Sequence, residues 1–214
     1  QRIQGNNPDG TRNVDLPVYL DVNNLIDYMV LHIYAGAEDW AFHNWWAARR
    51  RGPESQGFKF FSWDQEISND SLIRTHTLFE TRFEAPISSP SPSYLYGQLM
   101  ANPSFRQDFI DRVHKHLFND GLLTPEASAE RWNEREAEID KAIVGESARW
   151  GDSKRTPAYK REVEWLNEQR WMDQEYWPGI HPIAVQRFRN VGLYPDLEAP
   201  TFRVGGKTQH GGYF

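Results

Sequence analysis

Two stretches of this chain decide its fold: Asp39-Trp-Ala-Phe-His-Asn44 and Phe60-Phe-Ser-Trp-Asp64-Gln-Glu66. Each combines acidic or amide side chains with aromatic residues, and Asn44 and Asp64 are separated by twenty positions. The segment between the two stretches determines whether these side chains meet.

That segment predicts a β-hairpin. Trp45 to Arg50 and Phe58 to Trp63 are interpreted as strands, together spanning residues 45–63, and the glycine- and proline-containing residues 51–57 as the turn between them. Consecutive strands joined by a short turn most often pair antiparallel. The start of the first strand then lies beside the end of the second, so Asn44 is expected next to Asp64.

A buried helix is predicted before the hairpin. Residues 1–20 are an irregular lead-in, Asp21 is a suitable N-cap for a helix from about Val22 to Tyr34, and Gly36 is its stop. Its apolar residues cover more than one face, which is typical of a buried helix. His32 lies among them and is expected to be a hydrogen-bonded core histidine.

The C-terminal half is predicted to be helical. Residues 67–101 are rich in Ser, Thr and Pro and are interpreted as a long loop, and residues 194–214 as an extended tail or linker. Four helices are expected within residues 102–191. They run from Asn102-Pro103 to about Asn119, from Thr124-Pro125 to about Trp150, from Thr156-Pro157 to about Tyr176, and from near Pro182 to about Val191.

Composition limits the class of protein. A chain of 214 residues is long enough for one domain with a real core. Its net charge of −6 disfavours a nucleic-acid binder, and the absence of cysteine excludes disulfides and thiolate metal sites. The mean hydropathy is −0.75, and no apolar run approaches the ~18 residues of a membrane span. The opening residues show no signal peptide, and we expect the chain to be part of a longer protein.

The order of the polar groups matches the needs of phosphoryl transfer. That reaction requires a carboxylate near the attacking hydroxyl and divalent metal on the nucleotide phosphates. A protein kinase supplies these groups in a fixed order: a buried helix, a loop with Asp-x-x-x-x-Asn, a hairpin and a metal-binding Asp. Asp39, Asn44 and Asp64 follow this order, and hard oxygen ligands are those that magnesium prefers.

Several segments resemble the CotH kinase family, the spore coat protein H-like atypical protein kinases. The resemblance covers roughly residues 15–205 and is strongest at 20–66. Its motifs are Leu25-Ile-Asp-Tyr-Met, Asp39-Trp, His43-Asn-Trp-Trp, Phe58-Lys-Phe-Phe-Ser-Trp-Asp-Gln-Glu66, Asn102-Pro-Ser-Phe-Arg-Gln-Asp-Phe, Glu138-Ile-Asp-Lys-Ala-Ile-Val-Gly-Glu-Ser-Ala-Arg-Trp-Gly-Asp152 and Gly192-Leu-Tyr-Pro.

The resemblance implies an α+β, predominantly helical fold over residues 21–193, like the C-terminal lobe of a protein kinase with a β-hairpin next to the catalytic loop. It implies ATP and Mg²⁺ or Mn²⁺ as cofactors and a protein substrate with Ser or Thr. By position, Asp39 matches the catalytic Asp, Asn44 and Asp64 match metal ligands, and Glu66 takes the place of a supporting acidic residue. No segment before residue 21 resembles the N-terminal lobe. Members occur in bacterial spore coats and in exported or surface proteins.

Two other functions are compatible with the same residues. A carbohydrate-active or glycan-binding protein would use Asp39 with Asp64 or Glu66 as a carboxylate pair, and tryptophans as sugar platforms. A non-catalytic assembly module, or pseudokinase, would keep the fold for docking. The tryptophans at positions 40, 45, 46 and 63 are expected mainly to pack the hairpin onto the helical body.

Overall fold

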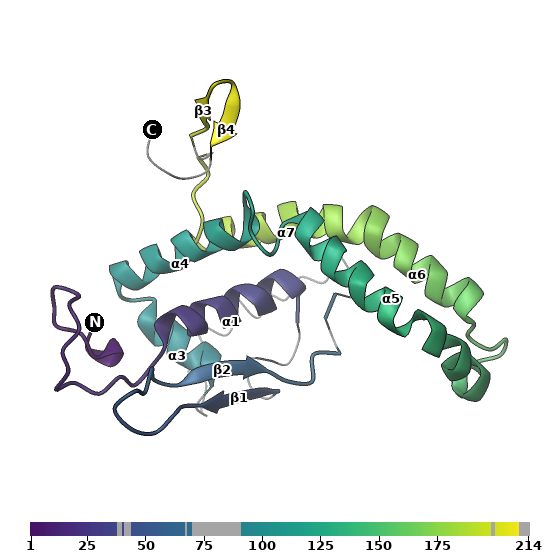
Figure 1. The fold of residues 1–214 in the computed structure, drawn as a ribbon, viewed down its shortest axis with the longest axis horizontal. Coiled ribbons are helices and arrows are strands. Elements are labelled where there is room, and N and C mark those ends of the chain that lie inside the picture. Colours follow the sequence, from purple (N-terminus) through teal and green to yellow (C-terminus); the bar gives the residue numbers. More distant parts are fainter. Residues whose placement is uncertain (38–39, 41–43, 67, 70–90, 198–199, 210–214) are drawn as a thin grey trace. The chain divides into compact units, whose positions relative to one another are not determined.

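The structure is a computed structural model that describes residues 1–37, 40, 44–66, 68–69, 91–197 and 200–209. The chain divides into two compact units, Gln1–Val113 and His114–Phe214. Helices dominate both, and each unit carries one two-stranded antiparallel sheet. The fold is therefore α+β and mostly helical, as predicted (Figure 1).

The first unit is built around helix α1 (Val22–Ala35). Asp21 caps it by accepting a hydrogen bond from the Asn24 amide at 3.0 Å, and Gly36 ends it in the left-handed conformation, with φ of 60°. Leu25 and Met29 are fully buried, as are several of their neighbours. The predicted helix, its cap, its stop and its burial are confirmed.

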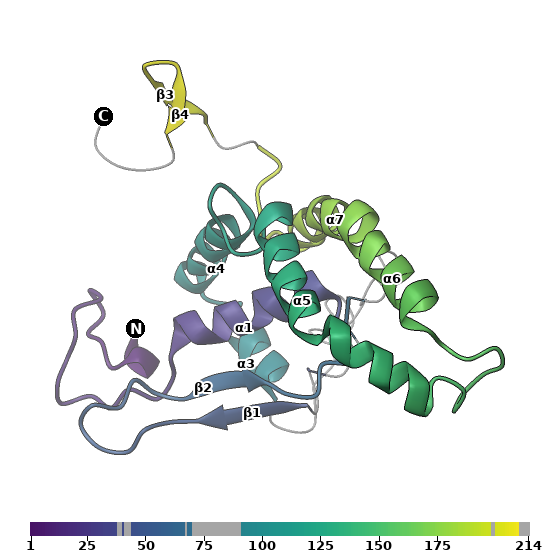
Figure 2. The same cartoon turned by 45° about the vertical axis from the view of Figure 1, so that its right-hand side comes forward.

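Strands β1 (Trp45–Ala48) and β2 (Lys59–Ser62) form the predicted antiparallel hairpin. Trp45 pairs with Ser62 and Ala48 with Lys59. Both views show the hairpin lying along α1 (Figures 1 and 2). The side chain of Asn24 fastens it there by hydrogen-bonding both main-chain groups of Phe60. The lead-in, which contains the short helix η1 (Arg2–Gln4), joins β2 through a parallel bridge between Leu20 and Phe58.

The interpretation of residues 67–101 as one long loop is wrong for residues 92–99. Helix α3 (Pro92–Leu99) begins there, because Ser91 accepts a hydrogen bond from the Tyr94 amide and proline occupies the first turn. Its Tyr96 is buried against Phe105 and Phe109 of α4 (Pro103–Leu117), with ring centroids 6.0 and 5.4 Å away. This burial holds a helix in a stretch whose composition favours a loop.

The second unit is organised by long helices. Helix α5 (Pro125–Trp150) starts at its Thr124 cap as predicted. It packs against α7 (Trp177–Asn190) and against the segment that precedes α7. Trp132 of α5 lies edge-to-face with Trp177, and its indole donates a 2.7 Å hydrogen bond to Gln169 of α6 (Leu166–Trp171).

The predicted start of the third helix is wrong by several residues. The chain stays non-helical at Thr156-Pro157, where the Tyr159 amide donates to the carbonyl of Gly151 at 2.8 Å and ties the segment to the end of α5. Helical structure begins with the π-helical turn η2 (Arg161–Trp165). It continues through α6 and a second π-helical turn, η3 (Met172–Tyr176), into α7.

The prediction of a separate fourth helix near Pro182 is also wrong. Pro182 lies inside α7 and removes one intrahelical donor. Ala184, Val185 and Phe188 after it are buried. Their packing outweighs the lost hydrogen bond and continues the helix.

The tail contains more structure than the predicted extended segment. Strands β3 (Phe202–Val204) and β4 (Lys207–Gln209) form a small hairpin around Gly205 and Gly206, both at positive φ. Across the described residues, no helix is both long and apolar enough to cross a membrane.

Candidate functional site

The β1–β2 pairing brings Asn44 and Asp64 together, as the hairpin predicted. Trp45, which follows Asn44, pairs with Ser62, two positions before Asp64. The side-chain amide of Asn44 donates a 3.3 Å hydrogen bond to the main-chain carbonyl of Asp64. Residues twenty positions apart in sequence therefore share one end of the hairpin.

Both residues adopt an uncommon backbone conformation. The φ angle is 56° at Asn44 and 55° at Asp64, in the left-handed region that Asn and Asp tolerate best among non-glycine residues. Gln65 links the two strand ends, because its side-chain amide lies 3.3 Å from the Asn44 carbonyl and 2.7 Å from that of Trp63. Strained conformations that are held by neighbours in this way are concentrated at functional sites.

The side-chain oxygens at this end of the hairpin suit a hard divalent cation. Asp64 and Glu66 are exposed, Asn44 is half-buried, and neither carboxylate has a hydrogen bond or ion pair with another described residue. Mg²⁺ takes one or two carboxylates together with phosphate and water oxygens, so this donor set fits. No group of three or more His, Asp or Glu side chains in the described part of the chain could hold a metal by itself. Any cation here would need ligands beyond the described side chains, such as the oxygens of a nucleotide or water.

Asp39, the predicted catalytic base, lies outside the described residues, but Trp40 beside it in sequence is described. Trp40 is buried, and its carbonyl accepts a hydrogen bond of 3.2 Å from the Tyr28 hydroxyl of α1. Burial raises the pKa of Tyr28, which keeps this hydroxyl protonated as a donor. The chain next to the predicted base is thus anchored to α1.

His32 is the predicted core histidine, not a ligand. The centroid of its ring lies 5.2 Å from that of Trp40 and 4.1 Å from that of Tyr28, both in tilted arrangements, and its Nδ1 donates to the Tyr28 carbonyl at 2.7 Å. Burial lowers the pKa of His32 to about 4, so the ring is neutral at pH 7.

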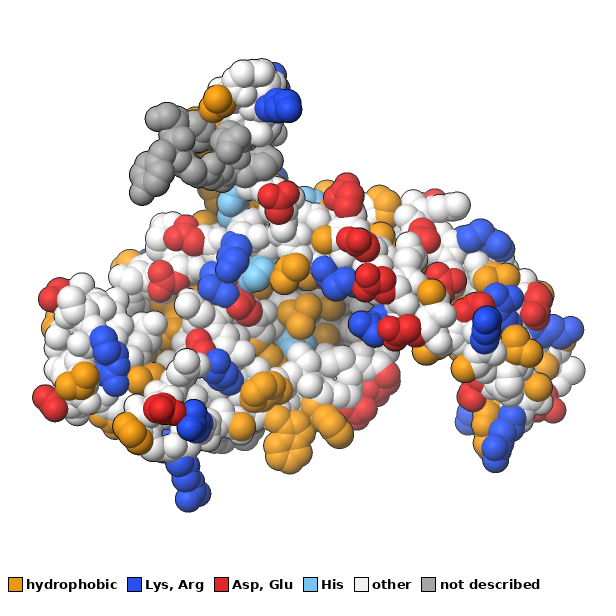
Figure 3. Space-filling model, in the orientation of Figure 1, with side chains coloured by type: hydrophobic (Ala, Val, Ile, Leu, Met, Phe, Trp, Pro, Cys, Tyr) orange, Lys and Arg blue, Asp and Glu red, His pale blue; other side chains and the backbone are white. Residues whose placement is uncertain are grey.

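The tryptophans of the hairpin divide between two faces. Trp40 is buried and Trp45 contacts the buried Phe60, as expected for residues that pack the hairpin onto α1. Trp46 and Trp63 are instead 63% and 59% exposed, together with Phe61 at 50%, so the packing prediction is wrong for these two. They lie on the opposite face because side chains alternate along a strand. Apolar side chains protrude over β1 and β2 in the space-filling view (Figure 3).

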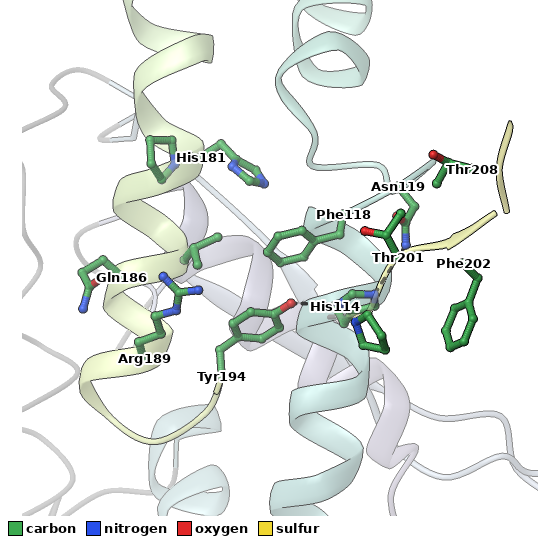
Figure 4. Close-up of a pocket in the computed structure, with 13 residues that line it drawn as sticks. His114, Phe118, Asn119, His181, Gln186, Arg189, Tyr194, Thr201, Phe202 and Thr208 are labelled. Carbon is green, nitrogen blue, oxygen red and sulfur yellow. Dashed lines mark hydrogen bonds between the residues drawn. The ribbon is translucent and has the colours of Figure 1, made fainter. Parts of the chain in front are cut away.

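A separate pocket of about 660 Å³ lies in the second unit. The rings of His114, Phe118 and Tyr194 line it as a triangle with nearly parallel planes, their centroids 5.0–6.1 Å apart, and the Tyr194 hydroxyl hydrogen-bonds His114 Nδ1 at 2.8 Å (Figure 4). Arg189 lies over the Tyr194 ring at 5.9 Å, and no carboxylate is present among the lining residues that the structure describes. The sequence motifs did not point to this pocket.

The comparison with protein families establishes the family of this chain, from a match that covers most of the first unit and part of the second. A family model described as CotH kinase protein matches residues 5–176. The chain belongs to the CotH kinase family. Searches of the curated proteins and of the solved structures found no match.

The matched range of the CotH family model includes α1, the β1–β2 hairpin and the positions of Asp39, Asn44, Asp64 and Glu66. It ends where α7 begins, so β3 and β4 lie beyond it. The juxtaposition of Asn44 and Asp64 is a structural fact of this CotH family member. The roles of the four side chains stay predictions.

Sequence reasoning missed the residues that hold the site in place. Asn24 lies in the first turn of α1, Tyr28 one turn later, and Gln65 between the two acidic side chains. Their partners, at Phe60, Trp40 and Asn44, are 36, 12 and 21 positions away. Only the placement of Gln65 between Asp64 and Glu66 was a local signal.

Proposed function

We propose that this chain is the C-lobe-like part of an ATP- and divalent-metal-dependent protein kinase that phosphorylates Ser or Thr. Family membership supports a kinase-related function, and the order helix, loop, hairpin and Asp supports phosphoryl transfer in particular. The observation that carries the proposal is the 3.3 Å contact between Asn44 and the Asp64 main chain. It places two hard-oxygen side chains at one end of a hairpin without using either carboxylate oxygen of Asp64.

In this proposal Asn44 and Asp64 hold Mg²⁺ or Mn²⁺, and Glu66 supports them. The metal, when bound, would neutralise charge on the nucleotide phosphates. The side-chain nitrogen of the half-buried Asn44 donates to the Asp64 carbonyl. The side-chain oxygen, Oδ1, is therefore the atom left to bind the cation. Asp64 is exposed and lies two residues beyond the end of β2, and in this proposal its carboxylate binds the same cation.

The exposed rings near this site suit the nucleotide base. Trp46, Phe61 and Trp63 are on the face of the hairpin away from α1, and Trp63 directly precedes Asp64. Stacking of a base on an aromatic side chain is worth about 1–3 kcal/mol. The same rings would also suit a sugar, which is the specific observation in favour of the glycan-binding alternative.

Asp39 would orient or deprotonate the attacking hydroxyl. A carboxylate in this role acts by positioning more than by its own basicity, because the transition state is loose. The Tyr28–Trp40 hydrogen bond supports this role, since it anchors the residue that follows Asp39 in sequence. An exported or spore-coat location belongs to the same proposal and is tested by fractionation of the cells that produce the protein.

Calorimetric titration of ATP in the presence of Mg²⁺ or Mn²⁺ tests the proposal. Wild-type chain should bind ATP only with metal. Asp64→Asn removes the charge at nearly constant shape, and we expect it to weaken binding at least about tenfold. Asp196→Asn, an exposed Asp in the second unit, is the matched control and should leave binding unchanged.

The glycan-binding and docking alternatives give different results in the same calorimetric titration. Binding of a soluble oligosaccharide without metal, lost on Trp46→Ala, would favour the glycan-binding function. If the chain is silent towards ATP, the titration is repeated on the protein extended upstream. Silence there as well would rule out a nucleotide-dependent kinase and leave a docking module.

A further inference from the structure

The two edges of the β1–β2 hairpin differ sharply. Along the outer edge of β2, the Phe58 amide donates to the Tyr19 carbonyl at 2.9 Å, and the Asp21 amide donates to the Phe58 carbonyl at 3.0 Å. Phe60 is satisfied in the same way by the Asn24 side chain, which accepts from its N–H at 2.6 Å and donates to its carbonyl at 3.3 Å. At Phe58 and Phe60 this side is therefore already occupied.

The outer edge of β1 has no main-chain partner among the described residues. Because the main-chain groups of Phe60 point toward α1, those of its antiparallel partner Ala47 point in the opposite direction, away from β2. The groups of Trp45, two residues earlier, point the same way. Within the described residues, nothing hydrogen-bonds to these outward N–H and C=O groups. Proteins usually cover or block such an edge, because it is a template for another strand.

One end of this edge is basic although the chain as a whole has a net charge of −6. Arg49, Arg50 and Arg51 follow β1 directly, and with Lys59 and Glu54 the first two line a hollow of about 330 Å³ beside Phe61. Glu54 pairs with Arg50 at 2.6 Å. Arg51 has no ion pair with any residue in the described part of the chain. Basic side chains surround this turn in the space-filling view (Figure 3).

We propose that the outer edge of β1 binds the peptide substrate as an added antiparallel strand, and that acidic residues of the peptide engage the arginines at its basic end. Main-chain hydrogen bonds to Trp45 and Ala47 would supply sequence-tolerant affinity, as in other cases of strand addition. The arginines would supply selectivity through charge complementarity. This inference rests on the proposed function for the identity of the ligand as a substrate.

The direction of β1 fixes the arrangement of the peptide. Antiparallel pairing is slightly more stable per residue than parallel pairing. An antiparallel peptide has its N-terminal part at the arginines and its C-terminal part at Asn44 and Asp64. Arg50 is six positions from Asn44, which is about 20 Å of extended chain at ~3.3 Å per residue. Acidic residues about six positions before the target hydroxyl are therefore the expected recognition element.

Fluorescence anisotropy of a labelled peptide tests this arrangement without nucleotide. The probe is fluorescein-Glu-Glu-Asp-Val-Thr-Val-Thr-Ser-Gly amide, added to the full 214-residue chain at low salt. We expect saturable binding that weakens as salt screens the acidic residues. The same peptide with Lys in place of the three acidic residues should bind at least about tenfold more weakly.

A proline substitution isolates the edge. Ala47→Pro removes the outward N–H and leaves the β1–β2 ladder intact, because proline is tolerated where the N–H faces away from the sheet. We expect affinity to fall at least about fivefold, while the matched control Ala47→Ser, which keeps the N–H, stays within about twofold. Should Ala47→Pro fail to fold by circular dichroism, a probe N-methylated at both Val residues and the Thr between them makes the same test from the ligand side.

Equal binding of wild type and Ala47→Pro, or of the acidic and basic peptides, would overturn the proposal. A different outcome is that wild type binds no peptide and forms a concentration-dependent dimer that Ala47→Pro abolishes. That result would overturn the proposal and show that the edge of β1 binds a second copy of this chain. ATP is absent from this experiment. Peptide binding therefore supports the strand-addition site whatever the result for ATP. If ATP binding fails both on the chain and on the protein extended upstream, the proposed function falls and the bound peptide is a partner, not a substrate. ATP binding without peptide binding would remove only this inference.

Discussion

The side chain of Asn24 holds Phe60 by both of its main-chain polar groups, at 2.6 Å to the N–H and 3.3 Å to the carbonyl. A helix side chain thereby does what a neighbouring strand would do for β2. These two hydrogen bonds fix the hairpin to α1 at Phe60, which is four positions before Asp64. The position of the predicted metal side chains thus depends on the first turn of α1.

Replacing Asn24 should destabilise the first unit. Asn24→Ala leaves two partly buried main-chain groups of Phe60 without a partner, and we expect a loss of about 2 kcal/mol in urea unfolding. Asn24→Asp keeps the acceptor and should lose less. Asn23→Ala, on an exposed position of the same turn, is the control and should change stability by less than about 0.5 kcal/mol. Equal effects at both positions would show that helix propensity, not the bond to Phe60, is responsible.

Two glycines of the hairpin turn should respond differently to alanine. Both have positive φ, 99° at Gly52 and 86° at Gly57. A Cβ at Gly57 would lie 2.5 Å from the Leu20 nitrogen, whereas one at Gly52 meets nothing within 4 Å. We expect Gly52→Ala to cost about 1 kcal/mol from backbone strain and Gly57→Ala about 2 kcal/mol more from overpacking, by thermal unfolding. Similar melting temperatures for the two variants would mean that the Leu20 segment gives way.

His32 predicts a pH dependence of stability. Its pKa is lowered from 6.5 to about 4 in the folded chain, so unfolding is coupled to proton uptake in acid. The stability that neutral His32 provides is complete above pH 6.5 and is lost as the pH falls toward 4. At ~1.4 kcal/mol per pH unit, the loss reaches about 3 kcal/mol. Urea unfolding from pH 7 to 4 should show this loss in wild type and a smaller one in His32→Phe. If the free energy of unfolding depends on pH in the same way in both proteins, His32 is not a buried neutral ring.

Trp46 should contribute to nucleotide binding without contributing to stability. Its ring is 63% exposed, so Trp46→Ala should change the free energy of unfolding by less than about 0.5 kcal/mol. If the base stacks on it, the Kd for ATP rises by about 5- to 150-fold. Leu197→Ala, at an 81% exposed residue of the second unit, controls for loss of exposed apolar surface. An unchanged Kd for Trp46→Ala would place the base elsewhere.

Asp39 and Asp64 should separate binding from chemistry. The variants are made in whichever form transfers phosphate, this chain or the protein extended upstream. Asp39→Asn should leave the Kd for metal-bound ATP within about twofold and lower the transfer rate at least about 100-fold. Asp64→Asn should weaken the nucleotide binding itself. Transfer of labelled phosphate to a Ser-containing peptide measures the first effect, and calorimetry the second. If Asp39→Asn transfers phosphate at the wild-type rate, another group orients the hydroxyl.

The parts of the fold that could be predicted depend on short-range signals. Asp21 and Gly36 mark the ends of α1 through bonds within one turn, and the hairpin follows from two aromatic strands and a glycine-containing turn. Antiparallel pairing then requires that Asn44 lie near Asp64, so half of the candidate site was accessible from sequence alone. The family resemblance, confirmed by the match to residues 5–176, supplied the remaining roles as predictions.

The parts that could not be predicted depend on distant partners. Helix α3 occupies a Ser- and Pro-rich segment because Tyr96 is buried by rings of α4, and α7 continues through Pro182 because Phe188 beyond it is buried. The Tyr28–Trp40 bond and the Asn24–Phe60 bonds likewise join positions that no local pattern relates. In each case tertiary contacts outweighed a local preference.

The close approach of Gly57 to Leu20 has an evolutionary consequence. It pins the start of β2 to the segment before α1, while residues 51–56 form a largely exposed turn that is closed by its own hydrogen bond from the Ser55 amide to the Gly52 carbonyl. Insertions or deletions in the turn change its length without shifting the register of Asn44 against Asp64. Changes in the number or charge of residues in this turn are therefore expected to alter peptide binding, if the proposed strand addition holds, and to leave the distance between the predicted metal side chains constant.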